Sequence, residues 1–137
     1  MINTIDEYLN LANSDNPIDN NKTKTEDLSL DVAMAIINDH PKRKSWLVHN
    51  KCISGEILQL LSVDEDVDVR FTVAMKKKCG RNIFKTLMND SDFSVRLATI
   101  RNNKFPIDLL ETMSNDNDIE ISSEAKRILN ERISQTH

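Results

Sequence analysis

The chain is poor in the residues that mark tight turns and build ligand pockets. Its 137 residues include two glycines and three prolines, too few for a β-rich fold of many short strands. Aromatic residues make up 4% of the chain, which leaves little for stacking on nucleic-acid bases or for base flipping. These shortages favour a helical protein and weigh against enzymes that act on bases.

Groups that could hold a metal or a cofactor are also scarce. Two cysteines, Cys52 and Cys79, do not make a disulfide framework or a four-ligand zinc site. His49 stands three residues before Cys52, but metal or thiol chemistry needs a third partner that this spacing does not supply. With no glycine-rich phosphate loop, catalytic triad or paired-carboxylate site visible, we expect no enzyme activity, no cofactor and no metal.

Charge and hydropathy patterns limit the compartment and the partners. The N-terminal residues lack the basic start and apolar run of a secretory signal, and no apolar stretch approaches the ~20 residues of a membrane span. We therefore expect a reduced, soluble, cytoplasmic protein that does not bind membranes. A net charge of -4 weakens any general attraction to nucleic acid and suits a partner with a basic surface.

The chain aligns with itself at a shift of 26 residues. Residues 64–70 fall on 90–96 and then on 116–122, so that Asp-Glu-Asp-Val-Asp-Val-Arg matches Asp-Ser-Asp-Phe-Ser-Val-Arg and Asp-Asn-Asp-Ile-Glu-Ile-Ser. The apolar block ahead of each loop keeps the same register: Ile57, Leu58 and Leu61, then Ile83, Phe84 and Leu87, then Leu109, Leu110 and Met113. A fixed period in this range is typical of stacked repeats. Such proteins are binding surfaces and rarely carry a catalytic pocket.

Each repeat is expected to form two short helices separated by an acidic loop. The expected helices cover residues 4–12, 31–37, 43–50, 54–61, 69–77 and 122–133. Segment 13–27 is rich in Asn, Asp, Lys and Thr and is predicted to be a loop or partly disordered. We therefore divide the single domain into an N-terminal cap helix with a polar linker (1–27) and a repeat region (28–137).

The repeated string resembles a known family. Asp-x-Asp-x-x-Val-Arg, then Ala or Thr, then Asn-x-x-x-Pro and a leucine-rich helix, resembles the variant leucine-rich repeat, a relative of HEAT and armadillo units. The best-matching residues are Asp90, Asp92, Val95, Arg96, Ala98, Asn102, Pro106 and Leu110. The resemblance implies an all-α fold, a short right-handed α-solenoid of three to four HEAT-like two-helix repeats. One family relative holds an iron–sulfur centre in a cysteine cluster that this chain lacks, so the resemblance implies no cofactor.

Size, acidity and architecture, though no motif, also resemble certain bacterial immunity proteins of contact-dependent growth inhibition. These are single-domain cytoplasmic inhibitors of nuclease toxins. The resemblance implies a protein-binding inhibitor, monomeric before it meets its toxin, that closes a basic active-site cleft.

The acidic loops are the first candidate site. Their acidic residues recur at the repeat period: Asp64, Glu65, Asp66, Asp68, Asp90, Asp92, Asp116, Asp118 and Glu120. One interpretation is structural, because an aspartate ahead of a helix caps it. The other is a negative strip that mimics a phosphate backbone and occupies a basic nuclease cleft. On that hypothesis, charge reversal at Asp64, Asp66 and Asp68 abolishes neutralisation and leaves stability unchanged.

Basic residues form the second candidate. Arg70 and Arg96 share one repeat position and either pair with the aspartate of an adjacent unit or form a basic line that faces the concave surface and binds phosphate. Lys76, Lys77 and Lys78 form a run that is either a solvated turn or part of a basic edge. The alternative functions are therefore a nucleic-acid-binding HEAT-like module and a generic protein-interaction scaffold. Of the remaining residues, Cys79 is expected to fill the core, and Trp46 is either a core residue or an exposed anchor.

Overall fold

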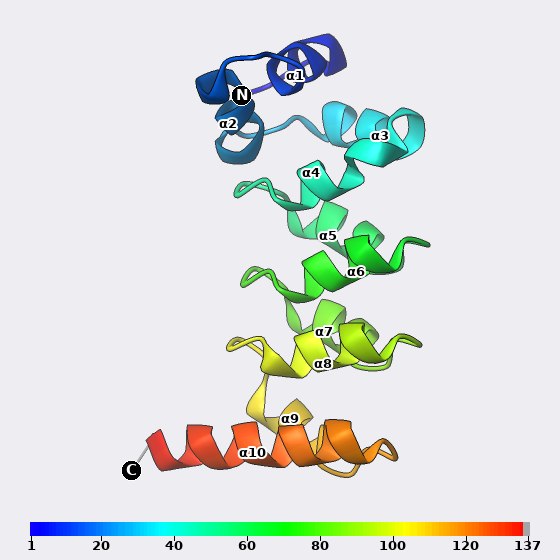
Figure 1. Ribbon diagram of the computed structural model, residues 1–137, viewed down its shortest axis with the longest axis vertical. Coiled ribbons are helices and arrows are strands. Elements are labelled where there is room, and N and C mark those ends of the chain that lie inside the picture. Colours follow the sequence, from blue (N-terminus) through cyan, green and yellow to red (C-terminus); the bar gives the residue numbers. More distant parts are fainter. Residues whose placement is uncertain (136–137) are drawn as a thin grey trace. The chain divides into compact units, whose positions relative to one another are not determined.

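The protein is all-helical over the residues that its structure describes. The computed structural model describes residues 1–135, which form ten α-helices and one 3-10 helix and contain no strand (Figure 1). The all-α class expected from the sequence is confirmed. The last two residues of the predicted repeat region, 136–137, lie outside the described residues.

The chain divides into two compact units, Met1–Leu61 and Ser62–His137. The first contains α1 (Ile5–Ala12), α2 (Pro17–Thr25), α3 (Leu30–Asp39), η1 (Pro41–Arg43), α4 (Lys44–Val48) and α5 (Gly55–Leu61). The second contains α6 (Val67–Ala74), α7 (Arg81–Leu87), α8 (Phe93–Arg101), α9 (Ile107–Met113) and α10 (Ile119–Gln135). The proposed division of the sequence at residue 28 stays a prediction.

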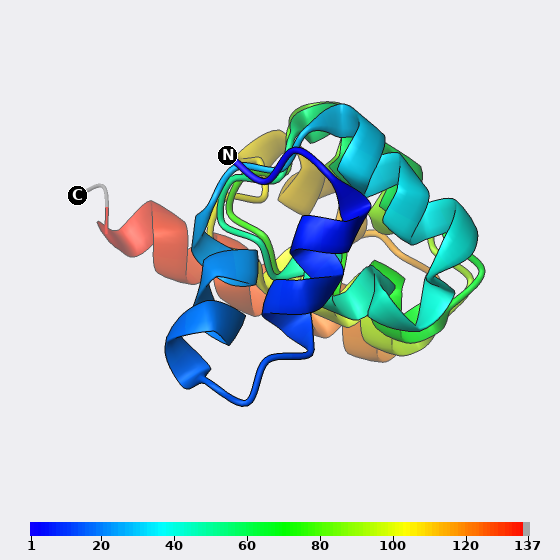
Figure 2. The same ribbon diagram turned by 90° about the horizontal axis from the view of Figure 1, so that it is seen from above.

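In the first unit, α1 lies against α2 and α3, while α4 contacts α2 and α3 (Figure 2). Helix α1 packs through Tyr8 and Ala12, which are both buried. Ile2 is fully buried, and its backbone pairs with that of the segment leading to α3, donating to Asp27 O and accepting from Ser29 N. The N-terminal residues are therefore part of the packed structure.

The loop predicted for residues 13–27 is wrong, because α2 occupies most of that segment. Only Thr23 of α2 is buried, so apolar periodicity gave no signal. The helix is specified at its ends instead. The Asn16 side chain accepts from Ile18 N at 2.9 Å, and Pro17 supplies the first residue of the helix. Asp19 lies in the first turn and Lys22 in the last turn, the arrangement that the helix dipole favours.

A buried asparagine ties α2 into the first unit. Nδ2 of Asn50 donates to Thr23 O and to Glu26 O, each at 2.8 Å. Its Oδ1 accepts from Cys52 N at 2.8 Å. One side chain thus satisfies two carbonyls at the end of α2 and one amide of its own turn.

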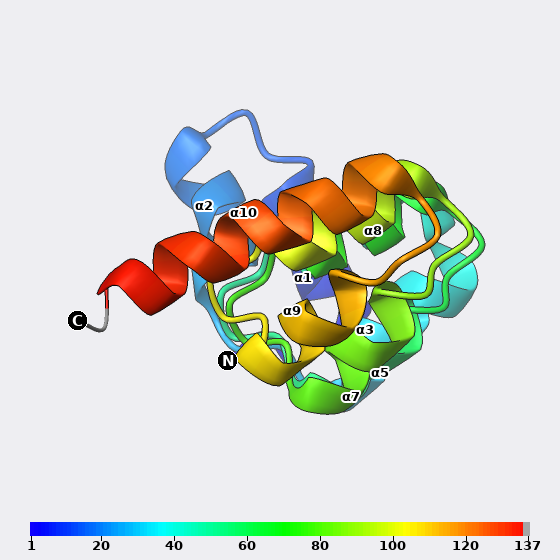
Figure 3. The ribbon, with the colours of Figure 1, turned by 90° about the horizontal axis from the view of Figure 1, so that it is seen from below.

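In the second unit, α6 packs against α8, α7 contacts both, and α8 and α9 lie on α10 (Figures 1 and 3). The core is built from the apolar positions that recur in the sequence, including Val69, Val73, Ile83, Phe84, Leu87, Val95, Ile100, Phe105, Leu110 and Ile121. The rings of Phe84 and Phe105 meet edge to face, with centroids 5.4 Å apart. The repeated apolar register therefore marks the core.

The predicted helices are present, with shifted ends. The helix expected at 69–77 is α6, which begins and ends earlier, and the one expected at 122–133 is α10, which is longer at both ends. Within residues 1–135, no helix is both long and apolar enough to cross a bilayer.

Candidate functional site

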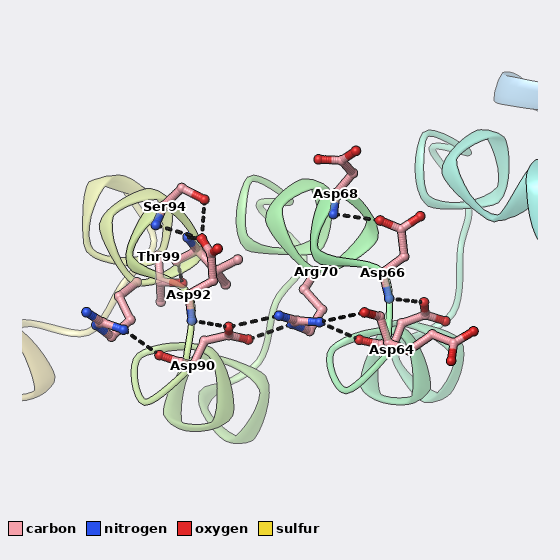
Figure 4. Close-up of polar contacts among 11 residues, drawn as sticks. Asp64, Asp66, Asp68, Arg70, Asp90, Asp92, Ser94 and Thr99 are labelled. Atoms are coloured by element: carbon pink, nitrogen blue, oxygen red, sulfur yellow. Dashed lines mark hydrogen bonds and ion pairs between the residues drawn. The ribbon is translucent and has the colours of Figure 1, made fainter.

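The acidic loops of the second unit share one local geometry. The first aspartate of each loop accepts a hydrogen bond from the backbone N–H two residues later, at 2.9 Å: Asp64 from Asp66, Asp90 from Asp92 and Asp116 from Asp118. The second aspartate does the same for the first turn of the next helix: Asp66 to Asp68 N, Asp92 to Ser94 N and Asp118 to Glu120 N (Figure 4). These carboxylates build the turn and cap the helix.

Arg70 joins one loop to the next (Figure 4). Its Nε lies 2.8 Å from Asp90 Oδ2, and its Nη2 lies 3.2 Å from Asp90 Oδ1. Its Nη1 donates to Asp64 O at 2.7 Å. The two side chains are 15% and 8% exposed, and the hydrogen bond to Asp90 raises the pKa of Arg70. All three guanidinium nitrogens are therefore engaged within the unit.

Arg96, at the position equivalent to Arg70, repeats the contact to the preceding loop but meets the second aspartate of the following loop rather than the first. Its Nη1 donates to Asp90 O at 2.7 Å, and its Nη2 lies 3.7 Å from Asp118 Oδ2. The prediction that these arginines pair with the aspartate of an adjacent unit is confirmed. We call Asp64, Arg70, Asp90, Arg96 and Asp118 the aspartate–arginine seam. Each guanidinium nitrogen of Arg70 makes a hydrogen bond within the protein, and the alternative of a basic line that faces the concave surface and binds phosphate stays a prediction.

Three acidic residues of the candidate acidic strip neither cap a helix nor pair with an arginine through their side chains. Glu65, Asp68 and Glu120 are exposed, and within residues 1–135 their carboxylates accept no hydrogen bond and form no ion pair. In Figure 4 the Asp68 carboxylate points away from the seam. These are the carboxylates that a basic partner would meet first.

The contacts of Asp64 and Asp66 overturn one expectation from the sequence. Charge reversal there would remove two acceptors of backbone N–H groups, so the triple variant would lose stability as well as charge. A variant that changes surface charge alone should replace Glu65 and Asp68.

The lysine run lies on the loop after α6, which Asn102 holds in place. Nδ2 of Asn102 donates to Ala74 O at 2.8 Å and to Lys76 O at 3.0 Å, while its Oδ1 accepts from Lys104 N at 2.9 Å. This repeats the arrangement of Asn50 in the first unit. Desolvation lowers the pKa of Lys76, whereas Lys77 and Lys78 are exposed.

The sequence reasoning missed an apolar groove between α6 and α8. A cavity of about 460 Å³ lies there, lined mainly by Phe71 of α6, by Met75 directly after α6, and by Phe93 and Leu97 of α8. Phe71 is 37% and Met75 61% exposed. We call this feature the α6–α8 groove. The signal was available in the sequence, since these two short helices carry apolar residues on their outer as well as their inner faces.

Two of the positions that line the groove become polar on α10, whereas the position of Phe93 holds the exposed Ile119. At the repeat shift, Phe71 and Leu97 correspond to Ser123, and Met75 to Arg101 and Arg127. Glu124 instead gathers an ion-pair cluster, with Arg101 at 3.1 Å and Arg127 at 2.6 Å. The hydrogen bond from Arg127, followed by that from Arg101, lowers the pKa of Glu124 to about 2. The groove therefore stops at a charged helix.

The remaining candidates have structural surroundings. Cys79 is buried, as expected, and its thiol donates to Val73 O at 3.1 Å. Burial raises the pKa of this thiol to about 11, which keeps it protonated and unreactive. Trp46 is half-buried, with the Arg43 guanidinium 4.9 Å from the centre of its ring. Among the described residues, no three metal-ligating side chains lie together.

No protein-family model, curated protein or solved structure matches this chain.

Proposed function

We propose that this chain is a protein-binding module built as a short α-solenoid of HEAT-like repeats, and that the α6–α8 groove is its interface. Three contacts that recur along the chain support the solenoid arrangement. They are the paired aspartate turns, the pairing of Arg70 and Arg96 with the following loops, and the two-carbonyl contacts of Asn50 and Asn102. Repeats of this kind offer extended binding surfaces.

The single observation that carries the proposal is the exposure of large apolar side chains in the groove. Scattered apolar residues are normal on a protein surface, but a hollowed patch formed by neighbouring apolar residues marks an interaction site. Phe71, Met75, Phe93 and Leu97 line one continuous cavity. Phe71, Met75 and Leu97 take no part in the seam, whereas the Phe93 ring lies 5.9 Å from the Arg96 guanidinium; the exposed surface of Phe71 and Met75 is available to a partner.

A second candidate function rests on the exposed carboxylates. Glu65, Asp68 and Glu120 neither cap a helix with their side chains nor join the seam. On this proposal the acidic loops meet a basic partner, such as the active-site cleft of a nuclease toxin, and exclude its substrate. Association would be fast and sensitive to salt, because exposed charges steer the encounter.

Site-specific photocrosslinking separates the two candidates. The photoreactive residue p-benzoylphenylalanine replaces Met75, Asp68 or, as a control on α9, the exposed Ile107. Each full-length variant is irradiated in an extract of its source cells. Groove binding predicts protein adducts at position 75 in excess over position 107, and an acidic interface predicts them at position 68.

Nuclease treatment of the adducts tests the nucleic-acid alternative. If the adducts at position 75 disappear after nuclease digestion, or if neither position gives more product than the Ile107 control, the proposed function is wrong.

A further inference from the structure

The α6–α8 groove has a direction, because its two helices are parallel. At their N-terminal ends, Arg70 of α6 binds Asp90 in the loop that leads into α8. At their C-terminal ends, Asn102 after α8 binds the carbonyls of Ala74 and Lys76 after α6. The N-terminal end of α6 is thus bonded to the N-terminal end of α8, and the C-terminal ends are bonded in the same way. The floor of the groove lies between these two sets of contacts.

The two ends of the groove differ in charge. The charged residues that line it are Lys77 and Arg101, both at the C-terminal end, and no carboxylate is among the lining residues. The Lys77 ammonium forms no ion pair within residues 1–135, and Arg101 shares Glu124 with Arg127. At the opposite end, Asp68 lies exposed in the first turn of α6. A chain of net charge -4 therefore presents a basic end in this groove.

The floor of the groove favours a helical occupant. The backbone groups of α6 and α8 are hydrogen-bonded within their helices, so these surfaces offer no strand edge to an extended segment. An occupant on an apolar floor has to satisfy its own backbone hydrogen bonds, as a helix does. The nine residues of α8 span about 13 Å, which matches two to three turns of a helix.

Charge sets the direction of that helix. Carboxylates on the occupant would pair with Lys77 and Arg101 at the C-terminal end of the groove. Acidic residues are favoured in the first turn of a helix, and the carbonyl ends of α6 and α8 attract the positive N-terminal end of an occupant. Both effects favour a helix that begins beside Lys77 and runs antiparallel to α6 and α8, with its last turn near Asp68.

We propose that the α6–α8 groove binds an amphipathic helix of a partner protein that has apolar residues along one face and acidic residues in its first turn, and that this helix lies antiparallel to α6 and α8. This inference rests on the proposed function and adds the chemical class and direction of the partner segment.

Designed peptides test the inference on the full-length protein. The first probe is a stapled helix of about 14 residues, roughly 21 Å long, with leucine and phenylalanine on one face, glutamate in the first turn and lysine in the last. The second has the same composition with glutamate and lysine exchanged, and the third is the first with a central proline. Affinities are measured by calorimetry, and a ¹³C-methyl methionine label reports on Met75.

The acid-first peptide is expected to bind about tenfold more tightly than the exchanged peptide, with a shift of the Met75 methyl signal, and the proline peptide is expected to lose binding. Phe71→Ser, which places at position 71 the residue type of positions 45 and 123, is expected to weaken binding about tenfold or more. Lys77→Glu is expected to reverse the charge preference. Ile107→Ser, at an exposed apolar position outside the groove, is the matched control and should change nothing.

The outcomes separate this inference from the proposed function. If both charged peptides bind equally and Phe71→Ser weakens both, the groove is a protein-binding site, but the acid-first, antiparallel occupant is wrong. Sedimentation that shows a dimer lost in Phe71→Ser makes a second copy of this chain the occupant and also overturns the inference. If no peptide binds and crosslinking at position 75 matches the Ile107 control, the proposed function fails together with the inference.

Discussion

The aspartate–arginine seam and the α6–α8 groove both use residues of α6 and α8, yet they use different positions of these helices. In the seam, the first loop aspartate recurs as Asp64, Asp90 and Asp116, and Arg70 matches Arg96, although positions 44 and 122 hold Lys and Ser. In the groove, Phe71 and Leu97 correspond to Ser45 and Ser123, whereas Phe93 corresponds to Val67 and Ile119 and stays apolar. The seam residues bond to one another within the protein, whereas Phe71 and Met75 of the groove leave apolar surface exposed.

The two regions also differ in energetic role. The seam pairs partly buried charged side chains and donates hydrogen bonds to backbone carbonyls. Removing one of its side chains therefore leaves a charged group or a carbonyl without its partner. The groove exposes apolar surface that the fold itself does not require. Substitutions in the seam should therefore act on stability and those in the groove on binding. The following predictions test that separation, from the largest expected effect to the smallest.

Removing the seam arginine should have the largest effect. Arg70→Ala leaves the Asp90 carboxylate, which is 8% exposed, without its partner, and we expect a loss of about 3 kcal/mol in the free energy of unfolding. Urea denaturation checks the value. Arg81→Ala, in an ion pair whose side chains are 52% and 60% exposed, is the control and should change the free energy of unfolding little, because solvent screens an exposed ion pair. Equal losses in the two variants would contradict the role given to the seam.

Asn102→Ala should be the next most damaging change. It leaves the carbonyls of Ala74 and Lys76 and the amide of Lys104 without their side-chain partner. We expect a loss of about 2 kcal/mol in unfolding free energy, measured by thermal and urea denaturation. The neighbouring Asn103→Ala, at an exposed position, should have little effect. A stable Asn102→Ala variant would mean that water replaces the side chain.

The acidic loop offers a matched pair of neighbouring aspartates. Asp66→Ala removes the cap of α6 and should cost about 1 kcal/mol, whereas Asp68→Ala should leave unfolding unchanged. Glu65→Lys combined with Asp68→Lys should keep stability and weaken binding of a basic partner, with a smaller salt dependence of the association rate. Unchanged binding by that double variant would remove the second candidate function.

The ion-pair cluster on α10 predicts a modest pH dependence. The pKa of Glu124 in the folded protein, about 2, lies below the value of about 4.3 in an unfolded chain. Its contribution to stability is therefore present above pH ~4.3 and is lost as the pH falls toward 2. Because Arg101 and Arg127 are more than half exposed, the contribution should be less than about 1 kcal/mol. The stability difference between the wild type and Glu124→Gln, followed by urea denaturation, should shrink from pH 6 to pH 2.5.

The sequence could predict the features that recur. The apolar register gave the core, and the Asp-x-Asp-x-x-Val-Arg string correctly predicted that Arg70 and Arg96 pair with the next loop. Prediction from the sequence failed where a structural feature occurs only once along the chain or has a weak apolar pattern. Helix α2 buries one threonine and is specified by Asn16, Pro17 and charged turns, which a search for apolar periodicity passes over. The groove was missed because Phe71 and Leu97 appear in the sequence as further core residues.

The sequence alone determined that the chain is helical and which positions correspond at the shift of 26 residues. It could do so because the apolar residues and the loop aspartates recur at that period. Only the tertiary structure decided which of these corresponding residues make contacts within the protein and which remain exposed to solvent. The carboxylates of Asp66 and Asp68 are alike in composition and charge. The Asp66 carboxylate accepts a hydrogen bond from the backbone N–H of Asp68, whereas the Asp68 carboxylate points to solvent. The two side chains differ because Asp66 precedes α6 and Asp68 lies in its first turn.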